Sequence, residues 1–502
     1  MAFLEMKGVT KCFKSVTANC DVSLSVEKGE VHALLGENGA GKSTLMNILY
    51  GMYDQSEGEI FLNGNKVHIK DTKQAIELGI GMVHQHFMLI PALTVIENVI
   101  LGLKENKMVL DLNIAAEKFK EMAKKYNMEI DPWTRVENLS VGQQQRLEIL
   151  KALYRNAELL ILDEPTAVLT PQEVVGLFDM VRKLTSEGHT VIFISHKLAE
   201  IMEICDRCTI LRQGRVVATV AVKDVKNREE LASLMVGKNV ELVTRKKEAT
   251  VGEEILKVEK LCAINQDKHP VLTDVTFSLH AGEILGICGV DGNGQSEMVK
   301  CITGLHKIKS GKYFIKSVEC THDTPKKVLK HKVAHIPEDR HRMGMIKNMN
   351  IEENLILMCY DQLPFSRHGI LNWKWIDKHS EEICKTYNIK TPSIKEMAGN
   401  LSGGNQQKFV VGRELDRDPD LLIAVHPSRG LDIGATKYIQ SRIVEERDKG
   451  TAVLLVSTEL DELLELSDRI LVMYRGKVMG IVDQKAATRE YLGKLMAGIT
   501  DI

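Results

Sequence analysis

The sequence predicts an α/β protein that consists of two copies of one domain, each built on a parallel sheet. The pattern of the 502-residue chain repeats itself after about 250 residues. Short apolar runs such as Leu159–Leu162, Val191–Ile194 and Val453–Val456 alternate with longer helical patterns such as Gln143–Leu153. Apolar runs of this length, separated by helices, are typical of buried parallel strands with inserted helices.

The repeat preserves the order of its parts. Four segments of the first half have counterparts in the second half. Val22–Val31 corresponds to Val275–Ile284, and Leu34–Ser43 corresponds to Ile287–Ser296. Further along, Leu139–Gln144 corresponds to Leu401–Gln406, and Ile194–Leu198 corresponds to Val456–Leu460. Such order indicates duplication of a whole domain. We therefore expect a first domain over residues 1–240 and a second over 254–502. The short, charged stretch 241–253 lacks apolar periodicity and is predicted to be the linker.

Composition is that of a globular protein without an excess of charge. Lys and Arg total 66 against 68 Asp and Glu, which gives a net charge of −2. This balance argues against a nucleic-acid partner, which usually requires a basic surplus. Hydrophobic residues make up 44% and charged residues 27%, which excludes disorder as the main state.

The sequence offers no segment for export or for crossing a membrane. The first residues lack the basic start and apolar run of a signal peptide, and no apolar stretch approaches the roughly 18 residues that span a bilayer. The ten cysteines are then expected to be reduced cytosolic thiols. Only Cys205 and Cys208 form a C-x-x-C pair, which without partner ligands predicts packing rather than zinc binding.

A phosphate-binding loop follows the strand predicted at Val31–Leu35. The pattern G-x-x-x-x-G-K-[ST] is matched by Gly36, Glu37, Asn38, Gly39, Ala40, Gly41, Lys42 and Ser43, and Thr44 begins a predicted helix. Backbone N–H groups of such a loop wrap a phosphate chain. We expect Lys42 to reach the β- and γ-phosphates and Ser43 to place its hydroxyl on Mg²⁺. The alternative is a strand-to-helix turn that binds nothing.

Two acids end the apolar strand Leu159–Leu162. Parallel strands present their carboxyl ends to the nucleotide crevice, so Asp163 fits a Mg²⁺ role. Glu164 fits the base that polarises an attacking water, a role worth about 10²–10⁴ in rate. Acids at strand ends are also often merely solvated, and the assignment depends on the neighbouring motifs.

His196 and Gln85 are weaker candidates for the same pocket. His196 follows the strand Val191–Ile194 and could contact both the γ-phosphate and a catalytic carboxylate, although a lone histidine is more often structural. Gln85 could join Mg²⁺ or the water through its amide, or it could be a surface polar residue.

This series of motifs resembles the ATPase subunits of ABC transporters over nearly the whole chain. It consists of the P-loop, Gln85, the segment Leu139–Gln143, the acids Asp163 and Glu164, and His196. The segment Leu401–Gln406, Leu-Ser-Gly-Gly-Asn-Gln, is the closer match to the family signature. The resemblance implies a parallel-sheet core, an antiparallel β part and a helical subdomain in each half. It also implies that two halves meet head to tail, with ATP between one P-loop and the other half's signature.

The second copy departs from the family pattern. Its loop retains Gly289, Gly292, Gly294 and Ser296 but has Gln295 in place of lysine. Its strand-end acids are replaced by Val425 and His426, and Thr458 stands in the place of His196.

The parts that the resemblance brings across the interface follow the same division. The first loop would meet Ser402, Gly403, Gly404, Gln406 and Asp432, all intact. The second loop would meet Ser140 and Gly142, where Val141 replaces a glycine, and the segment Ala167–Thr170, where Thr170 replaces that aspartate. We therefore predict one competent ATPase site and one degenerate site that hydrolyses poorly.

One further residue is assigned by the resemblance alone. The family usually stacks an aromatic ring on adenine upstream of the P-loop, and Phe13 is the candidate, with a place in the core as the alternative.

Tandem fusion with a degenerate second half resembles importers of ribose or galactosides and the related nucleoside importers that use a lipoprotein receptor. The runs Val83–Ile90, His335–Arg342 and Ala424–Asp432 favour the nucleoside type. The resemblance implies ATP and Mg²⁺ as ligands, two transmembrane permease subunits, a lipoprotein receptor within the complex and a place on the cytoplasmic face of the membrane. It also implies no direct contact with the transported molecule.

Two other function classes share the motifs. Soluble ABC translation factors keep both sites intact and carry a long charged helix pair between domains, which the short linker and the net charge of −2 argue against. DNA-repair ATPases of this type carry zinc-binding cysteine clusters and large insertions, and one C-x-x-C pair does not supply them.

Overall fold

The computed structural model describes residues 2–13, 16–37, 39–84, 87–103, 111–166, 169, 171–237, 246–265, 267–290 and 292–499. The chain divides into two compact units, Met1–Glu241 and Leu242–Ile502, which are called unit 1 and unit 2. Each unit has the same three parts, which are a mostly parallel sheet, an antiparallel sheet and a group of helices. The predicted fold class is therefore confirmed.

The central sheet of unit 1 places the ends of its parallel strands along one edge. The strand order is β10-β9-β3-β8-β7-β6, with only β9 and β10 antiparallel. The bounds are β3 Val31–Gly36, β6 Ile80–Val83, β7 Leu159–Asp163, β8 Thr190–Ile194, β9 Arg207–Arg212 and β10 Arg215–Ala221. The residues of β3 and β8 are all buried, as expected for strands covered on both faces.

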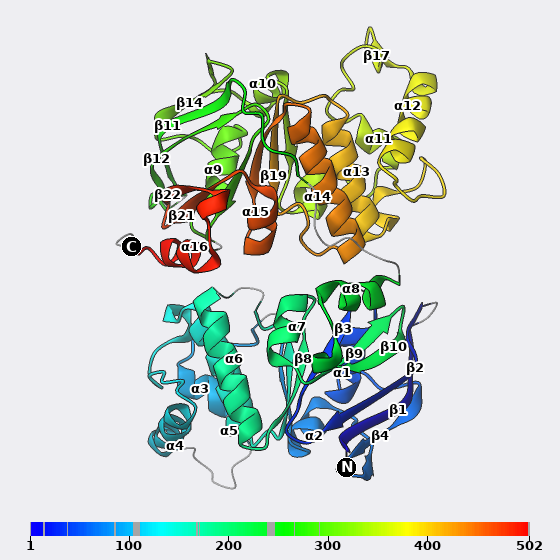
Figure 1. Cartoon of the computed structure of the whole chain (residues 1–502), viewed down its shortest axis with the longest axis vertical. Coiled ribbons are helices and arrows are strands. Elements are labelled where there is room, and N and C mark those ends of the chain that lie inside the picture. The colour runs from blue at the N-terminus through cyan, green and yellow to red at the C-terminus, as the bar shows by residue number, and fades with distance from the viewer. Residues whose placement is uncertain are drawn as a thin grey trace. The chain divides into compact units, whose positions relative to one another are not determined.

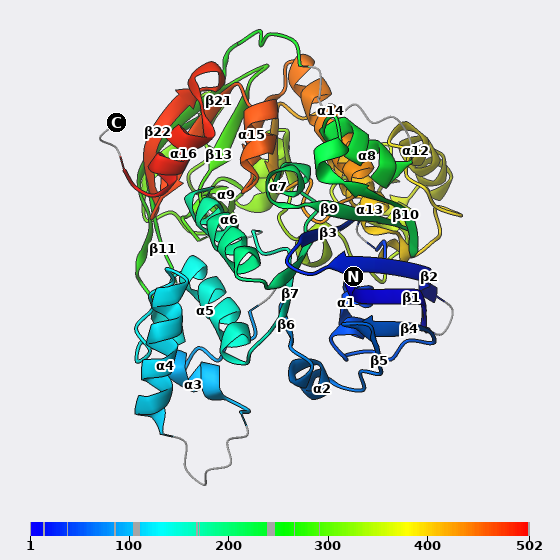
Figure 2. The ribbon, with the colours of Figure 1, turned by 60° about the horizontal axis from the view of Figure 1, so that its bottom comes forward.

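An antiparallel sheet packs against the helix that follows β3. It has the order β2-β1-β4-β5, with β1 Ala2–Phe13, β2 Val16–Glu27, β4 Glu57–Leu62 and β5 Asn65–Val67 (Figure 2). Helix α1 (Lys42–Leu49) shares one apolar core with both sheets, through residues such as Leu45, Leu4 and Ile161. This packing fixes the beginning of α1, where the P-loop ends.

The other helices of unit 1 form the helical part and the covers of the sheet. Helices α3 Val95–Ile100, α4 Leu112–Lys125 and α5 Val141–Tyr154 contact one another away from the antiparallel sheet (Figure 2). The remaining helices are α2 Thr72–Glu77, α6 Pro171–Ser186, α7 Leu198–Ile204 and α8 Arg228–Val236, with short 3-10 turns η1 Val136–Asn138 and η2 Val222–Asp224.

Unit 2 repeats this plan (Figure 1). Its central sheet has the order β16-β19-β20-β13-β21-β22 and its antiparallel sheet the order β12-β11-β14-β15. The strands are β11 Glu254–Ile264, β12 Pro270–His280, β13 Ile284–Cys288, β14 Ser310–Ile315, β15 Val318–Glu319, β16 Val333–Ile336, β19 Leu421–Val425, β20 Ala452–Val456, β21 Arg469–Tyr474 and β22 Lys477–Asp483.

The helices of unit 2 correspond to those of unit 1 in order. They are α9 Gln295–Ile302, α10 Pro325–Lys330, α11 Ile351–Leu355, α12 Trp373–Thr386, α13 Gly403–Leu415, α14 Ile433–Asp448, α15 Leu460–Leu466 and α16 Arg489–Met496, with short turns η3 Arg340–Gly344, η4 Ala398–Asn400 and η5 Gln484–Ala486. A small hairpin of β17 Ser366–Arg367 and β18 Ile370–Leu371 precedes α12. None of the described helices combines the length and the apolar character needed to cross a bilayer.

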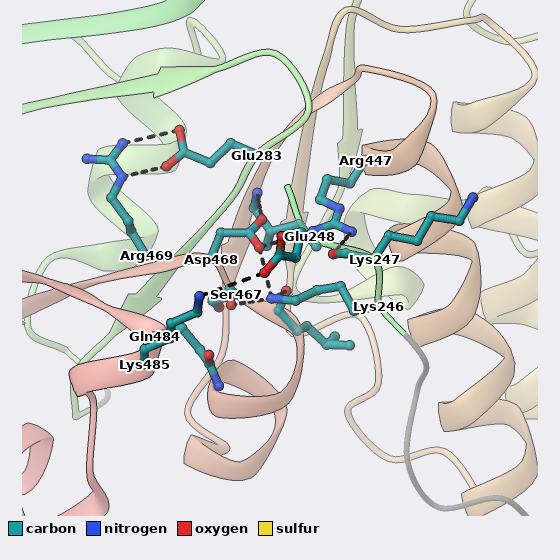
Figure 3. Close-up of polar contacts among 12 residues, drawn as sticks. Lys246, Lys247, Glu248, Glu283, Arg447, Ser467, Asp468, Arg469, Gln484 and Lys485 are labelled. Carbon is teal, nitrogen blue, oxygen red and sulfur yellow. Dashed lines mark hydrogen bonds and ion pairs between the residues drawn. The ribbon is translucent and has the colours of Figure 1, made fainter. Parts of the chain in front are cut away.

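The segment just before β11 is tied to unit 2 by a buried arginine (Figure 3). Arg447 is 1% exposed and donates from Nη2 to the carbonyl oxygen of Lys247 at 2.8 Å and from Nη1 to Asp468 Oδ1 at 3.0 Å. Lys246 Nζ lies 2.9 Å from the same Asp468 oxygen. The described part of the predicted linker thus lies against unit 2.

Candidate nucleotide site

The loop between β3 and α1 adopts a shape that requires glycine. Gly39 and Gly41 have φ angles of 80° and 98°, in the left-handed region that side chains rarely adopt. A Cβ on Gly41 would lie 2.5 Å from the carbonyl oxygen of Ala18. Gly41 is also the N-cap of α1 and supplies no side chain to it. The first N–H groups of α1 are therefore not used by a side-chain cap.

Lys42 is the buried cation of this loop. Its side chain is 7% exposed, and Nζ donates to the carbonyl oxygens of Gly36 at 2.7 Å and Glu37 at 3.0 Å. Burial lowers the pKa of Lys42, and the charges of Glu164 and Asp163 oppose that effect. A phosphate group on this loop would offset the cost of burying the ammonium.

The rest of the loop is arranged around this lysine. Ser43 is exposed at the start of α1, Thr44 and Glu37 are partly exposed, and Ala40 is buried at 4%. Ala40 donates its N–H to the carbonyl oxygen of Glu37 at 3.1 Å, which closes the turn. Asn38 lies outside the described residues.

Asp163 and Glu164 stand at the carboxyl end of β7, as predicted. Burial first, and then the charge of Glu164, raises the pKa of Asp163 to about 6, although Lys42 acts in the opposite direction. Glu164 has a φ of 48°, and its N–H donates to the carbonyl oxygen of Ile194 at 2.9 Å. This turn joins the ends of β7 and β8, so residues that follow both strands meet.

His196 reaches Glu164 from the end of β8. Its Nδ1 lies 3.0 Å from Glu164 Oε1, and the ring is 46% exposed while the carboxylate is 17% exposed. The hydrogen bond from His196 is the largest cause that lowers the pKa of Glu164. The structure thus brings Lys42, Asp163, Glu164 and His196 into one group, whereas Gln85 lies outside the described residues.

A buried network behind this group was not identified from the sequence. Glu200 is 8% exposed and accepts hydrogen bonds from Thr166 Oγ1 at 2.6 Å and from Ser195 Oγ at 2.8 Å. It therefore ties the segment after Glu164 to the segment before His196. The signal was present in the repeat, because Ser428, Ser457 and Glu462 occupy the same places in the second half.

Phe13 lies at the surface and not in the core. It is 40% exposed, and its ring meets Tyr53 edge to face with 5.3 Å between centroids. Lys11 Nζ lies 5.2 Å from the same ring. Tyr53 is a second exposed aromatic that the sequence analysis did not consider.

The loop of unit 2 keeps the backbone shape and loses the charge. Gly292 and Gly294 have φ angles of 84° and 102°, and a Cβ on Gly294 would lie 2.9 Å from the carbonyl oxygen of Val271. Gln295 is 7% exposed, like Lys42, but its amide donates to the carbonyl oxygen of Val290 at 3.2 Å. A neutral amide thus fills the place of the ammonium, beside Gly289.

At the end of β19 in unit 2 the turn is preserved, but the two acidic side chains found in unit 1 are replaced. His426 has a φ of 46°, and its N–H donates to the carbonyl oxygen of Val456 at 2.8 Å, as Glu164 does to Ile194. No carboxylate stands at Val425 or His426. Ser296 Oγ instead donates to Glu338 Oε2 at 2.9 Å, from the loop after β16.

The two signature segments differ in how their helices begin. Ser140 caps α5 with a capping box, because its Oγ accepts from the N–H of Gln143 at 3.3 Å and Gln143 accepts from the N–H of Ser140 at 2.9 Å. Ser402 makes no such cap on α13, and its Oγ accepts from Asn405 Nδ2 at 2.9 Å. A Cβ on Gly142 would lie 2.1 Å from Glu173 Oε1.

The remaining predicted residues of unit 2 lie around the start of α13. Asp432 caps α14 and accepts from the N–H of Ala435 at 2.6 Å, and a Cβ on Gly404 would lie 3.7 Å from its Oδ2. A Cβ on Gly403 would lie 3.1 Å from Arg340 Nη2, and the buried Gln406 donates to the carbonyl oxygens of Ala398 and Gly399. Ala167, Val168 and Thr170 of unit 1 lie outside the described residues.

Comparison with known proteins shows similarity over both halves of the chain. The chain matches the ABC transporter family over residues 20–167 and 272–428. It is 46% identical to the nucleoside import ATP-binding protein NupA of Lactococcus lactis subsp. cremoris, over 99% of this chain and 98% of that protein. It is also 46% identical to the guanosine import ATP-binding protein NupO of Bacillus subtilis, over the same shares. The ribose import ATP-binding protein RbsA of Clostridium tetani is 38% identical over 98% of this chain and 97% of that protein.

Proposed function

The chain belongs to the ABC transporter family, and from that premise we propose that it is the ATP-hydrolysing subunit of an importer whose cargo is a nucleoside. Two relatives at 46% identity carry nucleoside or guanosine import in their names, against 38% for the ribose relative. Sugar import by the same machinery is the second candidate. A soluble translation factor is a distant third, since the relatives above are all import proteins.

The observation that carries the proposal is the contrast between two loops of one shape. Lys42 and Gln295 are buried to the same extent, but only the first lies near two strand-end carboxylates. Unit 1 therefore has the charge needed to hold a triphosphate and to stabilise its transfer, whereas unit 2 has the shape alone.

Binding of the triphosphate rests on the P-loop of unit 1. The backbone N–H groups from Gly36 to Thr44 surround the phosphate chain, with Lys42 at the β- and γ-phosphates. Phe13, exposed beside Tyr53, provides the ring for the adenine. The degenerate loop, with Gly289, Gly292, Gly294, Gln295 and Ser296, binds a nucleotide but hydrolyses it poorly.

Mg²⁺ fits the donors of the same pocket. The hydroxyl of Ser43, the amide of Gln85 and the carboxylate of Asp163 are oxygen ligands of the kind that Mg²⁺ prefers. The raised pKa of Asp163 supports this fit, because a cation would offset the cost of its burial. The bound ion would neutralise charge that develops on the phosphates.

Hydrolysis depends on Glu164 and His196. Glu164 accepts a proton from the attacking water, and its lowered pKa keeps it ionised for that task. His196, 3.0 Å away, holds the carboxylate in position and contacts the γ-phosphate, and Gln85 helps to orient the water.

The second half completes the pocket in our proposal. Ser402, Gly403, Gly404, Gln406 and Asp432 face the P-loop of unit 1 in the closed state. The free beginning of α13 supports this role, since the N–H groups there are not used by a serine cap. Ser140 and Gly142 face the degenerate loop instead, and ATP binding and hydrolysis close and open the pair.

The partners follow from the importer role. We propose two transmembrane permease subunits, which this chain contacts at the cytoplasmic face of the membrane, and a lipoprotein receptor that belongs to the same complex. The chain itself contacts neither the cargo nor nucleic acid.

The test is ATP turnover of the complete complex. The chain is co-expressed with candidate permeases and a candidate lipoprotein receptor from the same genome, purified and reconstituted in vesicles. We expect guanosine or another nucleoside on the receptor side to raise ATP hydrolysis and to accumulate inside. Stimulation by ribose or galactose alone would assign the sugar role, and failure to co-purify with any permease would contradict the importer.

A further inference from the structure

Three potential metal ligands lie together in unit 2, and none of them belongs to its degenerate loop. They are Cys320 after β15, Asp323 before α10 and His331 after α10, and their ligand atoms all lie within 4.8 Å of one another. His331 Nε2 is 3.2 Å from Asp323 Oδ2. Cys320 is 1% exposed, whereas Asp323 and His331 are 18% and 28% exposed, so solvent reaches one side of the group.

A buried hydroxyl without a partner faces this group. Tyr313 is 0% exposed, and its OH has no hydrogen-bond partner among the described residues. The N–H of Cys320 donates to the carbonyl oxygen of Tyr313 at 3.0 Å, so Cys320, which directly follows β15, lies opposite Tyr313 of β14 and shares a face with it. Burying a hydroxyl without a hydrogen-bond partner destabilises a fold.

The duplication supplies an internal control for these four residues. Strand β4 corresponds to β14 and helix α2 to α10, with equal lengths and equal spacing. The positions that match Tyr313, Cys320, Asp323 and His331 in unit 1 are Ile60, Val67, Lys70 and Leu78. None of these can bind a cation under ordinary conditions. The fold therefore does not require the polar set, which is confined to unit 2.

We propose that Cys320, Asp323 and His331 bind a transition-metal ion of the zinc class. One sulfur, one oxygen and one nitrogen donor suit Zn²⁺, with water in the fourth position. Lys327 Nζ lies 3.5 Å from the other oxygen of Asp323, Oδ1. Oδ2 contacts His331 Nε2 at 3.2 Å, and a bound ion would replace that contact. The hydroxyl of Tyr313 then has a partner in the thiolate of Cys320.

The site joins two elements of the antiparallel part of unit 2. Cys320 follows β15, while Asp323 and His331 flank α10 on either side. A bound ion therefore fixes α10 against the edge of the sheet. Because the ion binds only the folded arrangement, it also stabilises unit 2.

The test uses Co²⁺ as a spectroscopic substitute for Zn²⁺. The full-length protein is stripped of metal, kept reduced and titrated with Co²⁺ without nucleotide or Mg²⁺. We expect one Co²⁺ per chain, with the sulfur-to-cobalt charge-transfer absorption of a thiolate ligand, and Zn²⁺ should displace it. Absence of that absorption in the unaltered protein would overturn the proposal.

Two variants replace a proposed ligand with the residue found at the matching position of unit 1. C320V should abolish the charge-transfer absorption, and H331L should weaken Co²⁺ binding by at least about tenfold, the effect of losing even a hydrogen-bond partner of a ligand. C262S, which changes a partly exposed cysteine of β11, should leave the absorption intact. Retention of the absorption in C320V would contradict the assignment. D323N repeats the test should C320V fail to fold, and ATP turnover should be unchanged in all four variants.

Discussion

Lys42 and Gln295 occupy equivalent places in two loops with nearly the same backbone, so exchanging them measures what one charge does. We expect K42Q to lower ATP turnover by about 100-fold or more, because the buried cation that faces the phosphates is lost. Q295K should leave turnover below twice that of the parent, because Val425 and His426 supply no carboxylate. Turnover by the purified chain and nucleotide binding are measured for both.

The exchange also distinguishes a folded loop that does not support hydrolysis from a loop that is misfolded. Both substitutions keep the left-handed glycines that precede the changed residue, so the loops should keep their backbone shape and both variants should unfold like the parent. Doubled turnover in Q295K would mean that the second loop lacks nothing but its lysine, which would contradict the predicted asymmetry.

The bond between His196 and Glu164 makes the pH profile informative. That hydrogen bond is the first cause that lowers the pKa of Glu164, and a general base must be deprotonated to act. In H196A the pKa of Glu164 should rise toward its ordinary value. The acid limb of the turnover profile should therefore move to higher pH, in addition to any fall in the maximum rate.

A matched histidine controls for general effects of the substitution. His189 lies 2.9 Å from the carbonyl oxygen of Ala157 and contacts no strand-end acid, so H189A should leave the acid limb in place. An unmoved limb in H196A, measured with saturating Mg²⁺ and ATP, would show that Glu164 is not the group that limits the rate at low pH.

At the scale of elements, the two signature helices should separate stability from turnover. Ser140 caps α5, so S140A should destabilise unit 1 by about 1 kcal/mol in urea unfolding with little effect on turnover. Ser402 does not cap α13, so S402A should change stability by less than about 0.5 kcal/mol. It should nevertheless lower turnover by about 10- to 100-fold, the value of a hydrogen bond to a charged group.

The reverse result would be decisive for the direction of the pairing. If S140A lowered turnover and S402A did not, the first half would supply the working signature. Measurement of both properties on both variants excludes a fall in turnover that only reflects partial unfolding.

At the scale of the whole molecule, the features that could be predicted from the sequence were its internal repeat and its short local motifs. The duplication, the P-loop and the ends of β3, β7 and β8 were all predicted, because each is a short pattern whose structural context lies within a few residues. The roles of all the site residues stay predictions, and Gln85 and Thr170 in addition lie outside the described residues.

Contacts between distant segments were not accessible in the same way. Glu200 with Thr166, and Arg447 with Lys247, pair residues whose proximity only the sheet topology creates. The group of Cys320, Asp323 and His331 was not predicted from the sequence for another reason. The spacing of paired cysteines is the sequence pattern that predicts a metal site, whereas this group consists of one cysteine, one aspartate and one histidine.

The turn at Glu164 is preserved at His426, with φ angles of 48° and 46° and the same backbone bond to the neighbouring strand. A left-handed backbone conformation is less stable by about 1–2 kcal/mol for a non-glycine residue. Unit 2 keeps this conformation at His426 although no catalytic carboxylate stands there. The loss of acidity in the second pocket is therefore confined to side chains. Within unit 2 the backbone that would carry a hydrolytic site is preserved, and only the side chains that hydrolysis needs are missing. Restoring activity there would therefore require substitutions of side chains and no change of the backbone.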